Sequence, residues 1–437
     1  MIDTKEQREK VILIGISGGK DDDTTASSLR ELADLADTAG AETVDTIIQP
    51  RERPDPGSYF GKGKIEEVRE RVLETGATGV ISDDELSPAQ MKNLEEGLQV
   101  KVMDRTMVIL DIFAKHAVTG EGKIQVELAQ LRYSAAHLEG LRASLSRLGG
   151  GIGTRGPGES KIEMDRRAIH ERIGILKKQL GEVERHREIT RKNRERSHVF
   201  VAAIVGYTNA GKSTLLNRLT NADVLTEDKL FATLDPTTRK LILPGGQEML
   251  LTDTVGFIRK LPHHLIEAFR STLEEAKYAD LILHVVDAGN PEADRQMLVV
   301  YDTLRELGIT DTEASSRNEN SPAPDGKNRE AEIVTVFNKW DTVTHPVTIR
   351  DFHAKETVRV SAKTGSGIEE LKGILSEVLR SRKVEFEKLF SYADAGIIQT
   401  IRRDGELLSE EYTPEGILVK ARIPAELAAR IGKNSAI

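Results

Sequence analysis

The sequence predicts a multidomain α/β protein, and three patterns support that prediction. Strand-like apolar runs alternate with helical patterns over the first hundred residues and again from about residue 198 to 380. The chain between these stretches is helical almost throughout, and the tail after residue 384 mixes short strand and helix patterns. Strand–helix alternation is typical of a parallel sheet covered by helices. We therefore expect two α/β units, a long helical hairpin between them and a small α+β appendage.

The bulk composition fits a globular protein with several cores. A chain of 437 residues exceeds one ordinary domain, and 38% hydrophobic with 30% charged residues is typical of soluble proteins. The sequence has no Cys, which excludes disulfides and thiolate metal sites. Its start, MIDTKEQREK, lacks the apolar core of a signal peptide, and no run reaches the roughly 18 apolar residues of a membrane span. We expect a cytoplasmic protein, one that can associate peripherally with membranes.

The N-terminal unit, residues 1–115, is expected to contain four parallel strands. Ser87 and Pro88 have the residue types of an N-cap and a first helical position. The apolar runs predict strands over 11–17, 43–49, 78–84 and 100–105, and the helical patterns predict helices over 27–39, 64–74 and 87–97.

The middle region, residues 116–196, is expected to form a projecting αα-hairpin. Helical patterns cover about 106–148 and 160–196, the second about 55 Å long if unbroken. They flank the tip GGGIGTRGPGES (149–160), which has six Gly. The end, 184–196, has almost no apolar face, as in a solvated helix or a linker.

The second α/β unit is predicted over 197–380 and a small C-terminal domain over 384–437. The polar stretch 311–330 interrupts the alternation and has the composition of a disordered insertion. In the tail, apolar runs over 384–390 and 416–423 predict two strands, accompanied by two short helical patterns.

A phosphate-binding loop is predicted at the start of the second unit. GYTNAGKS (206–213) has the P-loop spacing, directly after the apolar strand VFVAAIVG and before the helical run KSTLLNRLT. The backbone N–H groups and the helix N-terminus would hold phosphates. Lys212 would reach the β- and γ-phosphates, and Ser213 would bind Mg²⁺. A Gly-rich structural turn is the alternative for this motif alone.

Three further motifs follow in the order that a guanine-nucleotide site requires. In DTVG (253–256), Asp253 would join the Mg²⁺ shell through water, and the Gly256 N–H would face the γ-phosphate. In NKWD (338–341), Asp341 can accept two hydrogen bonds from guanine, and adenine cannot supply that pair. SAK (361–363) would complete the base pocket. The four motifs together predict a Ras-like, P-loop GTP-binding domain.

The second Mg²⁺ ligand is expected between the P-loop and DTVG. FATLDPTTR (231–239) holds three candidates, Thr233, Thr237 and Thr238, and spacing alone does not choose among them. Ordinary turn chemistry in a Pro-containing loop is the alternative.

These motifs resemble the bacterial HflX family of translation GTPases, in the Obg-related branch. GYTNAGKSTLLN, FATLDPTTR, DTVGF and NKWD are similar to that family, as are SYFGKGK (58–64) and the run from 125 to 163 upstream. The resemblance covers about 10 to 380, while the insertion 311–330 departs from the compact family pattern. It implies binding to the large (50S) ribosomal subunit and its RNA, splitting or rescue of stalled or idle ribosomes, and a helical hairpin reaching toward the peptidyl-transferase region. It also implies Thr233 as the Mg²⁺ ligand beside Ser213.

Two secondary implications of the resemblance concern ATP and K⁺. The family has been linked to ATP binding by the N-terminal region, but SYFGKGK lacks P-loop spacing and is better explained as a structural turn. P-loops with Asn at the position of Asn209 resemble those of K⁺-stimulated GTPases, in which the Asn helps to hold a cation near the phosphates. An Asn that tolerates a tight turn is the alternative.

The hairpin carries the expected RNA contacts. The whole chain has a net charge of −9, which argues against general nucleic-acid binding. However, residues 160–198 contain 12 Lys/Arg against 7 Asp/Glu. Arg side chains and a close-fitting Gly-rich tip suit phosphate contacts without base recognition. The candidate RNA-binding residues are Arg155, Lys161, Arg166 and Arg167; a solvated, flexible hairpin is the alternative.

The expected activity is GTP hydrolysis by a monomer that binds Mg²⁺, and K⁺ if Asn209 holds it. The groups expected to act in catalysis are Lys212, Asn209 and Gly256. The predicted nucleotide-binding residues are Gly206, Tyr207, Thr208, Asn209, Ala210, Gly211, Lys212, Ser213, Thr214, Phe231, Ala232, Thr233, Leu234, Asp235, Asp253, Thr254, Val255, Gly256, Asn338, Lys339, Trp340, Asp341, Ser361, Ala362 and Lys363. The alternatives are a nucleotide-gated ribosome-assembly module and an ATP-dependent remodelling of RNA or ribosomes.

Phe257 raises a question about the chemistry. It follows Gly256, where Ras-like enzymes have a Gln that orients the attacking water. An apolar ring cannot polarise water. We therefore expect slow hydrolysis by the protein alone and stimulation by the ribosome.

Overall fold

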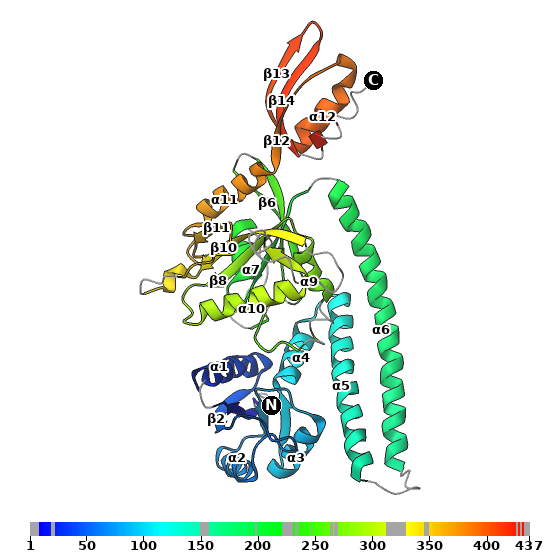
Figure 1. Cartoon of the computed structure of the whole chain (residues 1–437), viewed down its shortest axis with the longest axis vertical. Helices are drawn as coiled ribbons and strands as arrows, with labels where there is room; N and C mark the ends of the chain where they lie inside the picture. Colours follow the sequence, from blue (N-terminus) through cyan, green and yellow to red (C-terminus); the bar gives the residue numbers. More distant parts are fainter. Residues whose placement is uncertain are drawn as a thin grey trace, which may run out of the picture.

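The computed structural model describes three sheets linked by long helices. It covers residues 8–18, 22–148, 157–196, 199–220, 230–231, 234, 236–244, 246–262, 265, 270–311, 329–344, 349–424, 427–428 and 431. The molecule is elongated, with the N-terminal sheet at one end, the largest sheet in the middle and the smallest at the other end (Figure 1). The predicted multidomain α/β class is confirmed.

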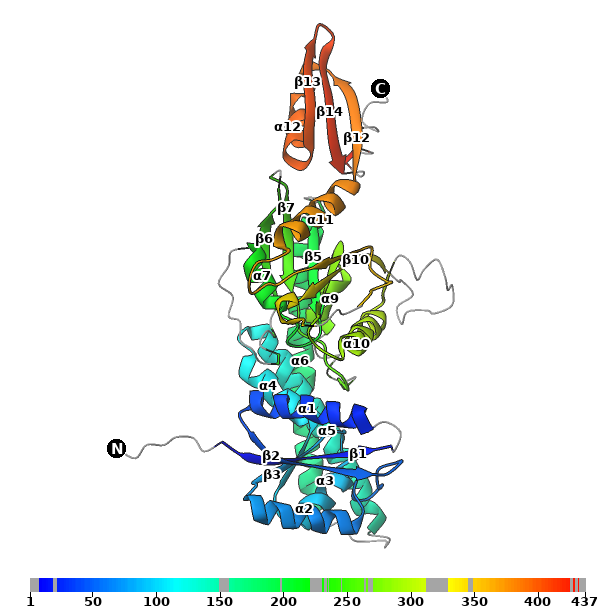
Figure 2. The ribbon, with the colours of Figure 1, turned by 90° about the vertical axis from the view of Figure 1, so that its left-hand side faces the viewer.

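The N-terminal sheet is parallel and has helices on both faces (Figure 2). Its strands lie in the order β2-β1-β3-β4. They are β1 (Lys10–Ser17), β2 (Glu42–Pro50), β3 (Gly79–Ser82) and β4 (Lys101–Asp104). The helices are α1 (Asp22–Ala39), α2 (Lys62–Thr75) and α3 (Pro88–Leu98). Alternate residues of a strand point to opposite faces. Val11 and Leu13 accordingly pack in the cluster that contains the α1 leucines, while Ile12 and Ile14 pack with α2 and α3.

Capping explains where these helices start. The Ser87 hydroxyl accepts a hydrogen bond from the Gln90 N–H, and the Gln90 side chain returns one to Ser87, so the predicted cap is confirmed. The predicted start of α1 at residue 27 is wrong, because the helix begins at Asp22. Its first turns are polar and show no apolar periodicity, although acidic residues there suit the positive end of the helix dipole.

SYFGKGK forms part of an ordered turn beside the N-terminal sheet. Asp55 and Tyr59 exchange backbone hydrogen bonds of 2.8 and 3.0 Å, and the Asp55 carboxylate accepts from the Gly57 N–H at 3.0 Å. The buried Tyr59 hydroxyl donates to Asp84 at 2.7 Å. These contacts account for the turn that the sequence favoured.

The described part of the helical region contains three helices: α4 (Arg105–His116), α5 (Gly120–Leu148) and α6 (Pro157–Arg196). The predicted helix over 106–148 is divided, because Thr119 caps α5 by accepting from the Gly122 N–H at 2.9 Å. Figure 1 shows α5 and α6 side by side. Leu128 packs against Ile173 and Leu176 between them.

The long helix α6 corrects one expectation and decides between two alternatives. It begins at Pro157, so the last four residues of the predicted tip are helical. Proline is favoured at a first helical position. The helix also continues to Arg196, which shows that 184–196 forms helix despite its polar faces. At 1.5 Å per residue its 40 residues span about 60 Å.

The middle sheet has seven strands in the order β11-β10-β8-β5-β7-β6, with β9 paired to β10. All its strand pairs are parallel except β6 with β7. Its elements are β5 (Val201–Gly206), α7 (Lys212–Thr220), β6 (Thr237–Ile242), β7 (Glu248–Asp253), α9 (Arg270–Lys277), β8 (Leu281–Asp287), α10 (Ala293–Glu306), β9 (Ile309–Asp311), β10 (Arg329–Asn338), η1 (Trp340–Thr342), β11 (Glu356–Arg359) and α11 (Ile368–Ser381).

The predicted disordered insertion lies mostly outside the described residues, which omit 312–328. Its two ends belong to strands, since Asp311 ends β9 and Arg329 starts β10. These strands pair in parallel, with Ile309 opposite Arg329. The expectation of disorder over all of 311–330 is therefore wrong at both ends.

The C-terminal sheet is antiparallel, in the order β12-β14-β13, and packs on α12. Its elements are β12 (Lys383–Phe390), η2 (Tyr392–Asp394), α12 (Ala395–Asp404), β13 (Glu406–Thr413) and β14 (Gly416–Pro424). The prediction of two strands missed β13. Its sequence, ELLSEEYT, is too polar to be recognised as a strand, and its backbone pairing with β14 makes it one.

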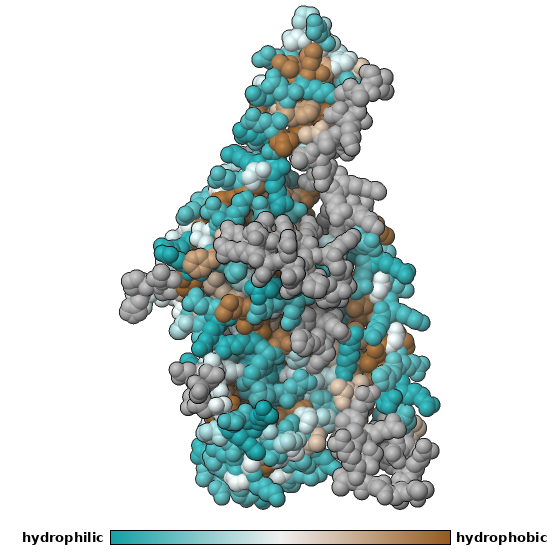
Figure 3. Space-filling view, in the orientation of Figure 1, coloured by the Kyte–Doolittle hydropathy of each residue, from teal (hydrophilic) through white to brown (hydrophobic). Residues whose placement is uncertain are grey.

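Figure 3 shows a mostly hydrophilic face with hydrophobic residues in small groups. Among the helices of the described part of the chain, none has both the length and the hydropathy needed to cross a membrane.

Candidate functional site

The P-loop joins β5 to α7 through two glycines that no other residue could replace. Gly206 has φ +156°, and a Cβ there would lie 2.3 Å from the Val285 carbonyl oxygen. Gly211 has φ +88°, and a Cβ there would lie 2.4 Å from the Asn338 amide nitrogen. Both distances are shorter than real Cβ contacts. The Val285 backbone of β8 and the Asn338 side chain can therefore lie this close to the P-loop only because residues 206 and 211 are glycines.

Lys212 lies inside this loop. Its ammonium donates to the carbonyl oxygens of Gly206 at 3.2 Å and Tyr207 at 2.9 Å. Burial lowers the pKa of Lys212 to about 8, although Asp253 opposes that shift. A cation enclosed by a curled backbone is suited to receive phosphate oxygens.

Two of the predicted Mg²⁺ ligands, Ser213 and Asp253, contact each other. The Ser213 hydroxyl, in the first turn of α7, donates to Asp253 Oδ2 at 2.6 Å, and Asp253 ends β7. A hydroxyl and a carboxylate are oxygen ligands of the kind that Mg²⁺ prefers, so this pair fits the ion. Thr233 lies outside the described residues, as do Ala232 and Asp235.

The DTVG segment is attached to the P-loop by its backbone. The Phe257 N–H donates to the Gly206 carbonyl at 3.1 Å, and the Thr208 N–H donates to the Phe257 carbonyl at 2.8 Å. A Cβ on Gly256 would lie 2.9 Å from Lys212 Nζ, Thr208 Cα and Thr208 Cγ2. Gly256 therefore lies directly against the loop.

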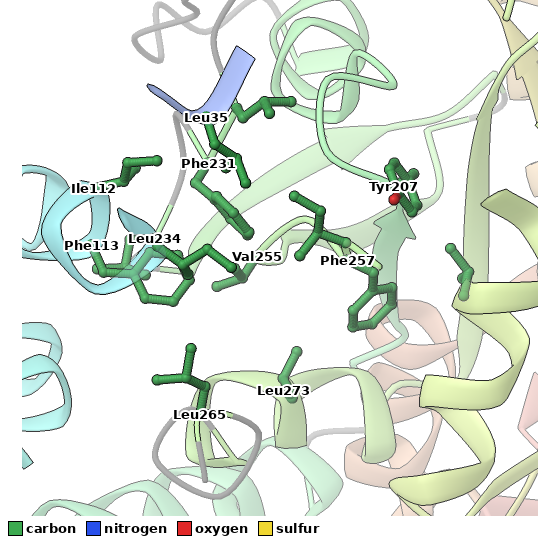
Figure 4. Packing of buried hydrophobic residues seen from close by; sticks show 14 of the residues in the cluster. Leu35, Ile112, Phe113, Tyr207, Phe231, Leu234, Val255, Phe257, Leu265 and Leu273 are labelled. Atoms are coloured by element: carbon green, nitrogen blue, oxygen red, sulfur yellow. The ribbon is translucent and has the colours of Figure 1, made fainter. Parts of the chain in front are cut away.

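The Phe257 side chain points into a hydrophobic cluster. It is 1% exposed, and Figure 4 shows it among Tyr207, Val255, Leu265 and Leu273. The ring therefore anchors this segment in the core.

Asn338 connects the base-side loops to the P-loop. Its amide nitrogen donates to the Ala210 carbonyl at 2.9 Å, and its carbonyl oxygen accepts from the Ala362 N–H at 3.0 Å. Asn338 is 2% exposed, so both bonds are sheltered from water. NKWD and SAK thus meet beside the P-loop, as their order in the sequence predicted.

Asp341 and Lys339, both in NKWD, have charged side chains near the contact between NKWD and SAK. A hydrogen bond from Ser361 lowers the pKa of Asp341, and Lys363 and Lys339 add to the effect. Lys339 has φ +57° and forms an ion pair of 2.8 Å with Asp287 at the end of β8. Sequence reasoning missed Asp287, although its place after an apolar strand, like that of Asp253, was a usable signal.

Several predicted nucleotide-binding residues have packing roles for their side chains. Phe231 contacts Phe113 edge to face, with ring centroids 4.7 Å apart, and Leu234 is buried in the same cluster (Figure 4). Trp340 lies under the Arg359 guanidinium at 4.6 Å. Thr254 donates to the Ile204 carbonyl at 2.8 Å. The structure thus leaves these four side chains engaged by protein.

The N-terminal unit also contacts this site, which the sequence did not predict. Tyr207 donates to Glu31 of α1 and accepts from the Arg259 N–H at 2.9 Å. Lys260 pairs with Asp83 and with Asp84, each at 2.6 Å.

A buried arginine completes this contact. Arg105, 2% exposed, pairs with Glu31 at 2.6 Å and Asp83 at 2.9 Å, and donates to the Arg259 carbonyl at 3.3 Å. Burial alone would raise the pKa of Asp83, but Arg105 and Lys260 hold that pKa below its usual value.

The expected RNA contacts on the hairpin are only partly described. Arg155 lies outside the described residues, and Lys161 is in α6 but its side chain is not described. Arg166 is half-buried and Arg167 is exposed. Arg172 is held by Glu127 through bonds of 2.7 and 2.9 Å.

The fold and this arrangement of loops define a P-loop GTPase. Three family models match consecutive parts of the chain: "GTP-binding GTPase N-terminal" over 26–114, "GTP-binding GTPase Middle Region" over 116–194 and "50S ribosome-binding GTPase" over 201–317. The chain belongs to the HflX family of GTPases.

Two relatives that match most or all of the chain support this assignment. GTPase HflX of Lacrimispora saccharolytica is 61% identical, covering 100% of this chain and 98% of its own. GTPase HflX of Escherichia coli is 42% identical, covering 87% and 85%. A GTP-binding protein from Sulfolobus solfataricus, solved in complex with GDP, has 21% identity and a TM-score of 0.43, covering 85% of this chain and 98% of that one.

Proposed function

We propose that this GTPase binds the large ribosomal subunit in its GTP state, splits or rescues stalled or idle ribosomes, and leaves after hydrolysis. The observation that carries the proposal is that the described nucleotide-binding motifs meet at one place, while the side chain that follows Gly256 cannot orient water. Phe257 is buried in the core, so a group outside the DTVG segment must complete the chemistry. The match to a "50S ribosome-binding GTPase" family model favours the ribosome as the source.

The roles of the site residues form part of this proposal. Lys212 contacts the β- and γ-phosphates, the Gly256 N–H senses the γ-phosphate, and Asn338 with Asp341 selects guanine. Ser213, Thr233 and, through water, Asp253 would hold Mg²⁺, which would supply positive charge against the charge that develops on the phosphates. Asn209, which is in the left-handed region at φ +58°, would help to hold K⁺ near the phosphates.

The hairpin supplies the ribosomal contact in this proposal. Its two helices are joined by hydrophobic packing and by ion pairs of 2.7 Å between Arg172 and Glu127 and 2.8 Å between Arg187 and Glu121. Two helices that are fixed to each other in this way can present the residues at their joined ends to a partner. Arg155, Lys161, Arg166 and Arg167 are the proposed contacts with RNA phosphates.

The test combines binding and turnover. Co-sedimentation with separated 50S, 30S and 70S particles is expected to show binding to 50S that is stronger with a non-hydrolysable GTP analogue than with GDP. Hydrolysis is expected to rise strongly on addition of 50S subunits. Unstimulated hydrolysis together with GTP-dependent binding would instead favour the alternative, a nucleotide-gated assembly module. Equal rates in KCl and NaCl would count against the role of Asn209.

A charge variant tests the hairpin separately. Replacing Arg166 and Arg167 by Ala is expected to weaken 50S pelleting and to leave GDP affinity unchanged, because both residues are on α6, remote in sequence from the nucleotide motifs. The control is Arg8→Ala, which removes an exposed cation paired only on the surface with Asp37. Pelleting equal to the parent protein would refute the proposed contact.

A further inference from the structure

Thr208, in the P-loop, has a buried hydroxyl that the described residues leave without a partner. The residue is 6% exposed, and its Oγ1 is enclosed without a hydrogen bond to any described group. Burying a hydroxyl without a partner is costly, so an orphan of this kind in a folded protein calls for an explanation. A ligand that supplies the partner would be such an explanation.

The neighbours of Thr208 indicate which ligand that is. A Cβ on Gly256 would lie 2.9 Å from Cγ2, the methyl carbon of Thr208, and 2.9 Å from Lys212 Nζ, so the side chain that carries the hydroxyl lies beside both residues. The P-loop lysine reaches the β- and γ-phosphates. The loop that contains Gly256 is ordered by the γ-phosphate in GTPases. The last phosphate of GTP is therefore the anion expected at this place.

Three other donors of this neighbourhood are engaged by the protein. The Thr208 N–H donates to the Phe257 carbonyl at 2.8 Å. Thr254 donates to the Ile204 carbonyl at 2.8 Å, and Ser213 donates to Asp253 at 2.6 Å. Among these hydroxyls, that of Thr208 remains able to donate to a phosphate oxygen.

We propose that the Thr208 hydroxyl donates a hydrogen bond to a γ-phosphate oxygen and so favours GTP over GDP. This inference rests on the nucleotide site proposed above. It also gives the γ-phosphate a polar contact from the P-loop side, opposite a DTVG segment whose Phe257 points into the core. GDP lacks the γ-phosphate and cannot form this bond.

The test uses the full chain and two conservative variants. Thr208→Val keeps the shape and removes the hydroxyl, whereas Thr208→Ser keeps the hydroxyl. Thr208→Val is expected to weaken binding of a non-hydrolysable GTP analogue by roughly 10- to 100-fold, the loss of a hydrogen bond to a charged group, with little change for GDP. Thr208→Ser is expected to retain both affinities.

The control is Thr335→Val, which removes a buried hydroxyl that already has a protein partner, Asp351, at 2.6 Å. Its GTP-analogue/GDP affinity ratio is expected to equal that of the parent protein. If Thr208→Val does not fold, Thr208→Ala and Thr208→Ser are compared instead, because they differ only in the hydroxyl.

One outcome would overturn the inference: an unchanged GTP-analogue/GDP affinity ratio in the variant without the hydroxyl, whether both affinities are kept or both fall by the same factor. Lys212→Ala separates this failure from failure of the site itself. GDP binding that survives Lys212→Ala would refute the proposed site. Abolished GDP binding in that variant, with an unchanged ratio in Thr208→Val, would refute only the role of Thr208.

Discussion

At the residue scale, Phe257 shows why an apolar side chain follows Gly256. Its backbone N–H and carbonyl pair with Gly206 and Thr208 on the P-loop, while its ring fills a cluster with Tyr207 and Leu273. Because backbone and side chain are both engaged, the residue fixes the start of the segment that follows Gly256. A Gln in this place would be a buried amide and could not orient water without leaving the cluster.

Phe257→Gln is therefore expected to lower stability and to leave chemistry in place. Loss of the ring and burial of an amide together cost about 3 kcal/mol. The measurement is the thermal transition that GDP shifts upward, since a ligand stabilises the unit that binds it. Turnover with 50S subunits, per folded molecule, is not expected to be abolished.

Phe257→Leu is the control and should lose about 1 kcal/mol, because it keeps an apolar side chain. Complete loss of stimulated turnover in folded Phe257→Gln with normal GTP and 50S binding would show that the ring contributes to chemistry.

At the element scale, a buried polar network connects the segment between NKWD and SAK to the middle sheet. Asp351 accepts from Thr335 of β10 at 2.6 Å and from Tyr301 of α10 at 2.7 Å, and His284 of β8 lies 3.7 Å away. Burial alone would raise the pKa of Asp351, but His284, Thr335 and Tyr301 hold it well below its usual value of 3.8. The network therefore favours the ionised carboxylate.

This shift predicts acid sensitivity. A carboxyl whose folded pKa is lowered contributes stability that is present above its unfolded pKa, near 3.8, and lost as the pH falls below it. Asp351→Asn should flatten the fall in the GDP-shifted transition temperature between about pH 5 and 3. It should also destabilise the protein at pH 7, because hydrogen-bonded partners of a buried carboxylate lose a charged acceptor.

Asp302→Asn is the matched control, since Asp302 is an exposed carboxylate paired with Arg305 on α10. It should keep the acid sensitivity of the parent protein. The same flattening in both variants would contradict a specific role for Asp351.

At the scale of the whole molecule, the nucleotide site and the N-terminal unit share a polar contact. Tyr207 is in the P-loop, and Lys260 is in the segment that follows Gly256. The side chains of both residues bond to carboxylates of the N-terminal unit. Arg105 joins those carboxylates to each other and to the Arg259 backbone. A displacement of the segment after Gly256 must therefore break or rearrange these bonds.

Asp83→Asn is expected to weaken this contact. Asp83 and Arg105 have side chains 3% and 2% exposed, and removing one partner of a buried ion pair costs about 3 kcal/mol. Amide hydrogen exchange should become faster in both α1 and the segment 257–262. The control, Asp37→Asn, breaks an exposed pair with side chains 62% and 60% exposed and should cost less than about 1 kcal/mol. Unchanged exchange in Asp83→Asn would mean that the pair does not hold the two units together.

Local rules made part of the fold predictable. Ser87 and Pro88 predicted the start of α3, and the alternation of apolar runs with helical patterns predicted two of the three sheets. The failures occurred where local rules are silent. The strand β13 is polar and exists because it pairs with β14, and the first turns of α1 lack an apolar stripe.

The sequence by itself determined the chemistry of the nucleotide site, because phosphate and guanine recognition require particular residues at fixed distances from strand ends. Gly206, Gly211, Lys212 and Asn338 were predictable for that reason. Only the tertiary structure decided that Phe257 is a core anchor, that the Thr208 hydroxyl has no partner among the described residues and that Arg105 connects two units. Each of these facts depends on what lies around a side chain, and the neighbours come from segments far apart in the chain, which short-range spacing cannot specify.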